Sequence, residues 1–176
     1  SDLATHEGVN ALLRARWWAA LAAADLRALQ TDAALDHYAK ALALLDPSPG
    51  RDSADFELIE REQAQALVTA GRFPEALAAA QHAADVLRAA GPTQAMAAAV
   101  AEFRVGMIQE QTRDDTAALA TFERARLAIE SAAGENDARL AQVLSAQGLV
   151  QLRLRNFDAA AASFQRGLEI ARQQLG

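Results

Sequence analysis

The sequence holds few side chains suited to acid–base, nucleophilic or metal chemistry, and they are far apart. Its three histidines are His6, His37 and His82, and no two stand three or four residues apart, the spacing that places two ligands on one helix face. The 176 residues include no cysteine, which excludes disulfides, thiolate metal sites and a cysteine nucleophile. We therefore expect His37 and His82 on solvent-exposed helix faces, and we predict no metal site.

Phosphate-binding and acyl-transfer motifs are missing as well. Lys40 is the only lysine, and neither a glycine-rich phosphate loop nor a nucleophile elbow occurs. Two acidic clusters, at 114–115 and 135–137, fall where helices are expected to begin, and carboxylates there interact favourably with the helix dipole. With no catalytic residue, cofactor site or metal ligand set, the sequence predicts a protein that is not an enzyme.

Composition and charge narrow the function classes further. The chain has 17 basic and 23 acidic residues and a net charge of −6, whereas nucleic-acid binding requires a basic face. It has no uncharged apolar run long enough to span a membrane, and no signal peptide at its start. We expect a cytoplasmic bacterial protein with neither nucleic acid nor membrane as a direct partner. Because the chain begins without methionine, we also expect it to be processed or part of a longer protein.

Breaks in the helical pattern recur at a fixed interval. Gly8, Gly50, Pro92 and Gly134 are 42 residues apart, and further breaks lie between them near residues 30–32, 71–74, 112–115 and 155–158. Four repeats follow, at approximately 8–49, 50–91, 92–133 and 134–175, each with two segments joined by a tight turn. We expect eight helices, at 9–29, 32–46, 52–70, 74–90, 93–112, 116–132, 135–154 and 158–174.

Corresponding positions of the four repeats hold residues of the same kind. One column is alanine throughout, at positions 34, 76, 118 and 160. A second column is small (Ala22, Ala64, Gly106 and Gly148). A third is aromatic in three of four repeats (Tyr38, Ala80, Phe122 and Phe164). Small residues at a fixed point let two helix backbones approach closely, and the aromatic side chain fills the space beside them.

At these positions the sequence resembles the tetratricopeptide repeat (TPR) family, whose pattern begins W-x2-L-G-x2-Y and continues A-x3-F. The first repeat reads W-x2-L-A from Trp18 and A-x3-Y from Ala34, and the fourth reads A-x3-F from Ala160. The 42-residue period is similar to the long repeats of kinesin light chains and of bacterial regulators. The resemblance implies an all-α fold, in which about four antiparallel helical hairpins stack into an α-α superhelix, a TPR-like solenoid. We expect one domain over residues 1–176.

Two adjacent tryptophans stand in the first repeat. Trp18 occupies the family's tryptophan position and is expected in the core, although the next two repeats hold Glu60 and Glu102 there. Trp17 belongs to a column that is apolar in all four repeats, so we expect it to pack as well. The alternative for Trp17 is an exposed anchor for a partner.

The resemblance also implies that the first helix of each repeat lines a concave groove. The side chains that we expect to contact a peptide there are Arg16, Arg27, Arg61, Gln65, Phe103, Met107, Leu149 and Arg153. A mildly basic groove around an apolar patch suits a segment with an apolar anchor and acidic residues. The alternative for Phe103 and Met107 is packing against the next helix.

These observations predict a non-catalytic protein–protein interaction module that binds a peptide or partner segment in the groove. The alternatives are a sensor or scaffold segment of a larger bacterial regulatory protein, or a self-association domain. The last expected helix keeps the columns of the interior repeats. Because solenoids need a polar outer face at their ends, we expect this open C-terminal end to pack against further chain or to form a homodimer.

Overall fold

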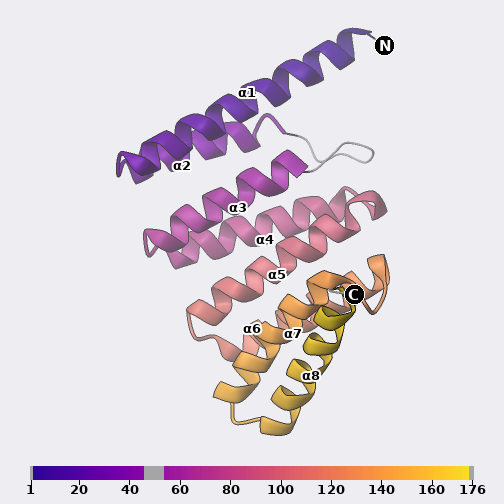
Figure 1. Ribbon diagram of the computed structural model, residues 1–176. Coiled ribbons are helices and arrows are strands. Elements are labelled where there is room, and N and C mark those ends of the chain that lie inside the picture. Colours follow the sequence, from indigo (N-terminus) through magenta and orange to yellow (C-terminus); the bar gives the residue numbers. More distant parts are fainter. Residues whose placement is uncertain (1, 46–53, 175–176) are drawn as a thin grey trace. The chain divides into compact units, whose positions relative to one another are not determined.

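The computed structural model describes the backbone of residues 2–45 and 54–174, and side chains from residue 10 onward. Within these ranges every regular element is a helix, and the helices follow one another as antiparallel hairpins (Figure 1). The elements are α1 (Asp2–Arg27), α2 (Thr31–Leu42), α3 (Ala54–Thr69), α4 (Phe73–Ala89), the 3-10 turn η1 (Pro92–Gln94), α5 (Ala95–Gln111), α6 (Asp115–Ala133), α7 (Ala138–Arg153) and α8 (Phe157–Gln174). The predicted all-α fold of four helical hairpins is confirmed.

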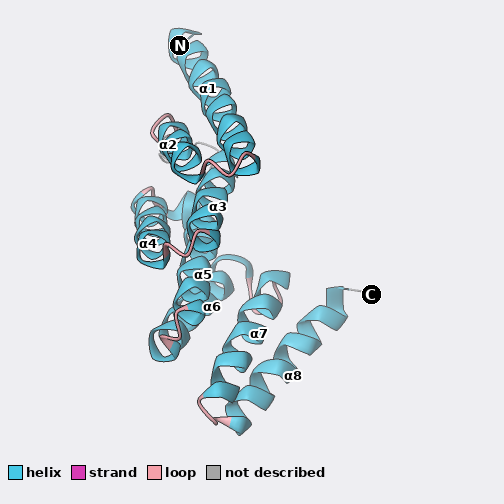
Figure 2. Cartoon of the chain, turned by 90° about the vertical axis from the view of Figure 1, so that its left-hand side faces the viewer, coloured by secondary structure: helices cyan, strands magenta, loops and turns pink. Residues whose placement is uncertain are grey.

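The chain divides into two compact units within α4, the N-terminal unit (Ser1–Ala80) and the C-terminal unit (Gln81–Gly176). In the N-terminal unit α1 packs on α2, and α2 packs on α3. In the C-terminal unit α5, α6, α7 and α8 each pack on the next in the chain, with short loops between them (Figure 2). The second helix of one hairpin thus meets the first helix of the next, which is how stacked repeats bury their apolar faces. The single-domain extent stays a prediction.

The four turns inside the hairpins have the same backbone geometry at 42-residue spacing. Each has one residue with positive φ, namely Leu29 (61°), Gly71 (72°), Arg113 (66°) and Arg155 (63°). The next residue donates its backbone N–H to the carbonyl five positions back, as Gln30 does to Asp25 at 2.9 Å. This is the Schellman arrangement that ends a helix with a left-handed residue. The register inferred from the sequence is therefore present in the backbone of both units.

Three helix ends differ from the prediction by more than two residues. The first helix begins at Asp2 and not at residue 9, because a single glycine such as Gly8 is tolerated inside a helix. The second ends at Leu42 and not at residue 46, which lies outside the described residues. The seventh begins at Ala138 and not at residue 135, because Gly134 leaves α6 with a φ of 89° and the Asp137 carboxylate caps α7 by accepting the Arg139 N–H at 3.0 Å.

The two helices of each C-terminal hairpin meet at a glycine. A Cβ atom added at Gly106 would lie 2.5 Å from the ring of Phe122, and one at Gly148 would lie 2.7 Å from the ring of Phe164. Phe122 is fully buried, whereas Phe164 is partly exposed. By contrast, a Cβ at Gly167 would make ordinary contacts of 3.5 Å. A small residue is therefore required at positions 106 and 148, where an aromatic side chain of the second helix packs against the first helix.

We expect Gly106→Ala to lower the free energy of unfolding by about 1–3 kcal/mol, because the buried Phe122 ring must move to admit the methyl group. Gly167→Ala should be neutral or stabilise by up to ~1 kcal/mol, since alanine favours the helix and the space is free. Gly148→Ala should fall between them. Urea unfolding followed by circular dichroism measures all three, and equal stability of the Gly106 and Gly167 variants would contradict this packing.

Candidate functional site

A cavity of about 590 Å³ opens between α1, α2 and α3 in the N-terminal unit. Its lining residues are Leu26, Leu29, Thr31, Tyr38, Arg61, Glu62, Gln65, Ala66, Thr69 and Ala70. Two of the predicted peptide contacts, Arg61 and Gln65, lie in this wall and are exposed. The other two from this unit do not line it. Arg16 donates two hydrogen bonds of 2.9 Å to the Asp55 carboxylate, and Arg27 is exposed at the end of α1.

Tyr38 closes one side of this cavity and is the only tyrosine in the chain. Its side chain is buried, and its hydroxyl donates a hydrogen bond to the Glu62 carboxylate. Burial, the negative charge of Glu62 and this hydrogen bond all favour the protonated phenol, and together they raise the pKa of Tyr38 to about 12. The hydroxyl is therefore a fixed donor and takes no part in acid–base chemistry at neutral pH.

A second groove, of about 490 Å³, runs between α5 and α7 in the C-terminal unit. It is lined by Phe103, Met107, Glu110, Ala141, Gln142, Ser145, Ala146 and Leu149. The structure thus brings together the three predicted apolar contacts. Leu149 is 49% exposed, while Phe103 and Met107 are half-buried and also pack against the core, with the Phe103 ring 5.5 Å from that of Phe122. Phe103 and Met107 therefore line the groove and also pack within the unit, so the alternative of packing holds for part of each side chain.

Arg153, the fourth predicted contact of this unit, is held by two carboxylates. It lies 2.7 Å from both Glu110 and Asp115, which belong to the preceding hairpin. These hydrogen bonds raise the pKa of Arg153 above its ordinary value and lower the pKa of Asp115. The α5–α7 groove is consequently not basic, contrary to the expectation from the arginine positions.

The expected environments of His37 and Trp17 also require correction. His37 is not solvent-exposed: its Nδ1 lies 2.6 Å from Asp25, and its ring stacks on Trp18 at 5.2 Å. His82 is exposed, as predicted. Trp18 is partly buried, with the Lys40 ammonium 5.0 Å from its ring centroid. Trp17 is not covered by the described residues, since 76% of its surface is exposed, which fits the alternative of an exposed anchor.

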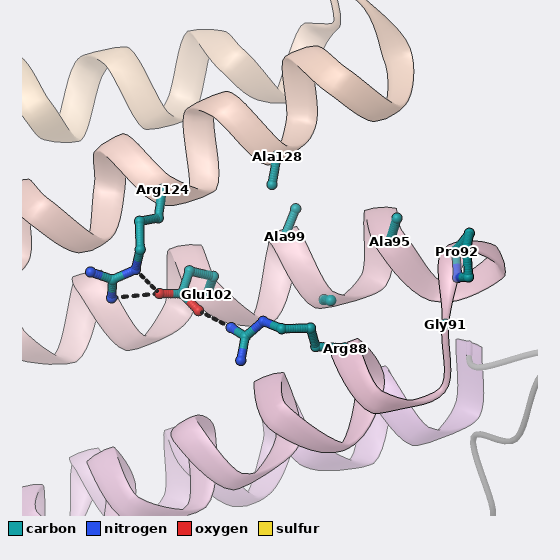
Figure 3. Close-up of a pocket in the computed structure, with 9 residues that line it drawn as sticks. Arg88, Gly91, Pro92, Ala95, Ala99, Glu102, Arg124 and Ala128 are labelled. Carbon is teal, nitrogen blue, oxygen red and sulfur yellow. Dashed lines mark hydrogen bonds and ion pairs between the residues drawn. The ribbon is translucent and has the colours of Figure 1, made fainter.

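A third cavity, of about 430 Å³, lies among the end of α4, η1, α5 and α6. Its lining residues are Arg88, Gly91, Pro92, Ala95, Ala98, Ala99, Glu102, Arg124 and Ala128. Figure 3 shows the two guanidinium groups on either side of the Glu102 carboxylate, with the alanines towards the other end. Glu102 stands in the tryptophan column, and a carboxylate among alanines leaves this space unfilled. Sequence reasoning missed the cavity, although a glutamate in that column was the available signal.

The Glu102 carboxylate is buried and fully engaged. One oxygen accepts from Arg88 at 2.7 Å and the other from Arg124 at 2.8 Å, so both flanking second helices bind it. A buried charge is tolerated when it is paired in this way. Among the described residues no group of three or more His, Cys, Asp or Glu side chains could hold a metal ion. None of the described helices has the length and apolar character needed to cross a membrane.

Comparison with known proteins identifies the repeat. Residues 95–173 match the family model described as tetratricopeptide repeat. No curated protein matches the sequence. Among solved structures, apo RapI is 14% identical with a TM-score of 0.73, covering 93% of this chain and 57% of that chain. Aspartyl phosphate phosphatase F from Bacillus subtilis is also 14% identical with a TM-score of 0.73, covering 93% of this chain and 41% of that chain.

A third solved structure, MamA, is 14% identical with a TM-score of 0.60, covering 92% of this chain and 80% of that chain. These likenesses show the fold. The chain spans less than two thirds of the length of RapI and of phosphatase F.

Because Tyr38 is the only tyrosine, its ionisation can be followed by tyrosinate absorbance in the near ultraviolet. We expect a midpoint at about pH 12 in the folded protein, against about 10 in urea. The unfolded chain then loses the proton first, so stability should fall as pH rises from about 10 towards 12. Glu62→Gln, which keeps an acceptor but removes the charge, should lower the native midpoint part of the way. A native midpoint near 10 would show that the phenol is not buried against Glu62.

Glu102→Gln should lower the free energy of unfolding by about 1–2 kcal/mol, because the buried group loses two charge-assisted hydrogen bonds. The cost stays moderate since Arg88 and Arg124 are more than half exposed and remain hydrated. Glu75→Gln, at an exposed ion pair with Arg72, is the control and should leave urea unfolding unchanged. Equal effects of the two changes would mean that burial of Glu102 adds nothing.

Proposed function

This chain carries tetratricopeptide repeats, and on that premise we propose that it is a non-catalytic interaction module that binds a peptide or a segment of a partner protein. The observation that carries the proposal is the α5–α7 groove, where Phe103, Met107 and Leu149 meet. They come from the first helices of two consecutive repeats, the surface on which such repeats are expected to receive a ligand. The groove volume of about 490 Å³ lies within the range of pockets that bind ligands.

The chemistry of this groove favours an apolar anchor. Its wall is mostly apolar, and Gln142 and Ser145 add hydrogen-bonding groups along one side. Glu110 and Arg153 neutralise each other, so an acidic ligand residue would gain little here. We therefore propose that a large apolar side chain enters between Phe103 and Leu149 and that ligand backbone groups bond to Gln142 and Ser145.

The α1–α3 cavity has a different character. Arg61 lies at its wall, exposed, and no ion pair of Arg61 is found within the described residues. An acidic ligand residue can pair with it without displacing an internal partner. We propose that this cavity takes the acidic residues that the sequence predicted. A sensor or scaffold segment of a larger regulatory protein would use the same surfaces, and a cytoplasmic location in a bacterium stays a prediction.

The anchor is tested with peptides selected from a random phage-displayed library on the full chain, labelled with a fluorophore. Leu149→Ala should weaken peptide binding by about tenfold or more, because it removes one wall of the groove. Fluorescence polarisation measures the dissociation constants.

Leu127→Ala is the matched control. Leu127 is 51% exposed, close to the 49% of Leu149, but it lies on α6 and lines none of the three cavities described above. Peptides whose affinity falls equally with both changes would bind elsewhere. If the affinity of the selected peptides is unaffected by Leu149→Ala, the α5–α7 groove is not the binding site.

A further inference from the structure

Helix α1 presents an uncharged face that no described residue of its own unit covers. Leu13, Trp17 and Leu21 stand four residues apart and are 48%, 76% and 43% exposed. Ala20, Ala24 and Ala28 are exposed on the same side of the helix. We call these six residues the α1 stripe. None of them carries a charge or a hydrogen-bonding side chain other than the Trp17 indole.

The repeat register shows what this face normally contacts. The equivalents of Trp17 in the later repeats are Ile59, Ala101 and Val143, which are 2%, 1% and 1% exposed. Ile59 clusters with residues of α2, and Val143 with residues of α6. In both cases the first helix of a hairpin packs on the second helix of the hairpin before it. Trp17 therefore stands at a stacking position, whose equivalents are buried at the α2–α3 and α6–α7 contacts.

Helix α8 is less apolar than α6 at two matching positions. The column of Leu119 in α6 becomes Ala161 in α8, and that of Ile129 becomes Ala171. Leu119 and Ile129 both belong to the core cluster that joins α6 to α7. Alanine at these positions leaves α8 with less apolar surface than α6 offers to α7. The exposed Leu168 and Phe157 remain on α8, as the homodimer predicted from the sequence would need.

We propose that the α1 stripe is an interface with a second copy of this chain, in which two α1 helices pack antiparallel about a two-fold axis between residues 20 and 21. This arrangement sets residues opposite each other whose numbers add up to 41. Trp17 then faces Ala24 of the second copy, and Leu13 faces Ala28. Leu21 faces Ala20. Every large side chain meets a small one, which is the interdigitation that close helix packing requires.

The stripe fits this occupant in charge and in size. The six side chains of the stripe carry no charge, so they do not repel those of an identical copy. One tryptophan and two leucines from each copy would bury on the order of 800 Å² in total, below the roughly 1,200 Å² of stable interfaces. The dimer is consequently weak, and we expect it to form only at high protein concentration. The stripe and the α5–α7 groove share no residue.

Sedimentation equilibrium of the full chain over a concentration series tests the proposal. The weight-average mass of the parent protein should rise above the monomer mass as its concentration approaches ~1 mM. Trp17→Ala should raise the dissociation constant by about tenfold or more. Leu168→Ala, at a residue that is 51% exposed on α8, should leave it unchanged. Circular dichroism confirms that both variants fold, which the exposure of Trp17 leads us to expect.

Disulfide cross-linking tests the register, since the chain has no cysteine of its own. In the antiparallel pair the two Ala20→Cys positions lie about 1.5 Å apart along the helix axis, and the two Ala28→Cys positions about 22 Å apart. Mild oxidation should therefore link the Ala20→Cys protein as a dimer and leave the Ala28→Cys protein uncross-linked.

Three results would overturn the proposal. A parent protein that stays monomeric at ~1 mM would exclude a second copy as the occupant of the stripe. Loss of the dimer in Leu168→Ala but not in Trp17→Ala would place the interface on α8. Cross-linking of Ala28→Cys as readily as Ala20→Cys would exclude the antiparallel register.

Discussion

The two helices of each C-terminal hairpin approach each other so closely that an aromatic ring occupies the place of a side chain. The ring of Phe122 lies where the Cβ of residue 106 would be, and the ring of Phe164 does the same at residue 148. The N-terminal unit builds the equivalent position from alanine and tyrosine, with Ala22 and Tyr38 both buried. Because the rings fix the distance within a hairpin, they also fix which side chains are left to contact the next one.

Arginine side chains form ion pairs between neighbouring hairpins. Arg16 reaches Asp55, Arg72 reaches Asp32, and Arg153 reaches both carboxylates of the preceding hairpin. Exposed pairs of this kind add little stability, since water screens them. Their forked geometry instead favours one register between adjacent helices. A side chain used in this way is not available to a ligand, and this explains why the arginines did not make the α5–α7 groove basic.

Two of the surfaces that the stacking contacts leave open are mainly apolar. The α5–α7 groove has Leu149 exposed at its edge. The α1 stripe contains the exposed Trp17, whereas the residues of the same column in the later repeats are buried. An exposed tryptophan is expensive for a monomer in water and common at the centre of an interface. A module with one groove for a ligand and one end for assembly is consistent with the repeat architecture, because each surface belongs to different helices.

The sequence by itself determined the period, the helical hairpins and the positions of the turns. A 42-residue register of small, aromatic and turn residues can be recognised from residue types alone, because helix packing demands them at set intervals. The sequence also predicted Phe103, Met107 and Leu149 as peptide contacts, and these three side chains do line one groove. Only the tertiary structure decided the state of Trp17, His37, Glu102 and Arg153. A column shows which way a side chain faces, but its burial and charge depend on its neighbours. No described residue of its unit covers Trp17, and His37 contacts Asp25 and Trp18. Glu102 binds two guanidinium groups, and Arg153 binds two carboxylates.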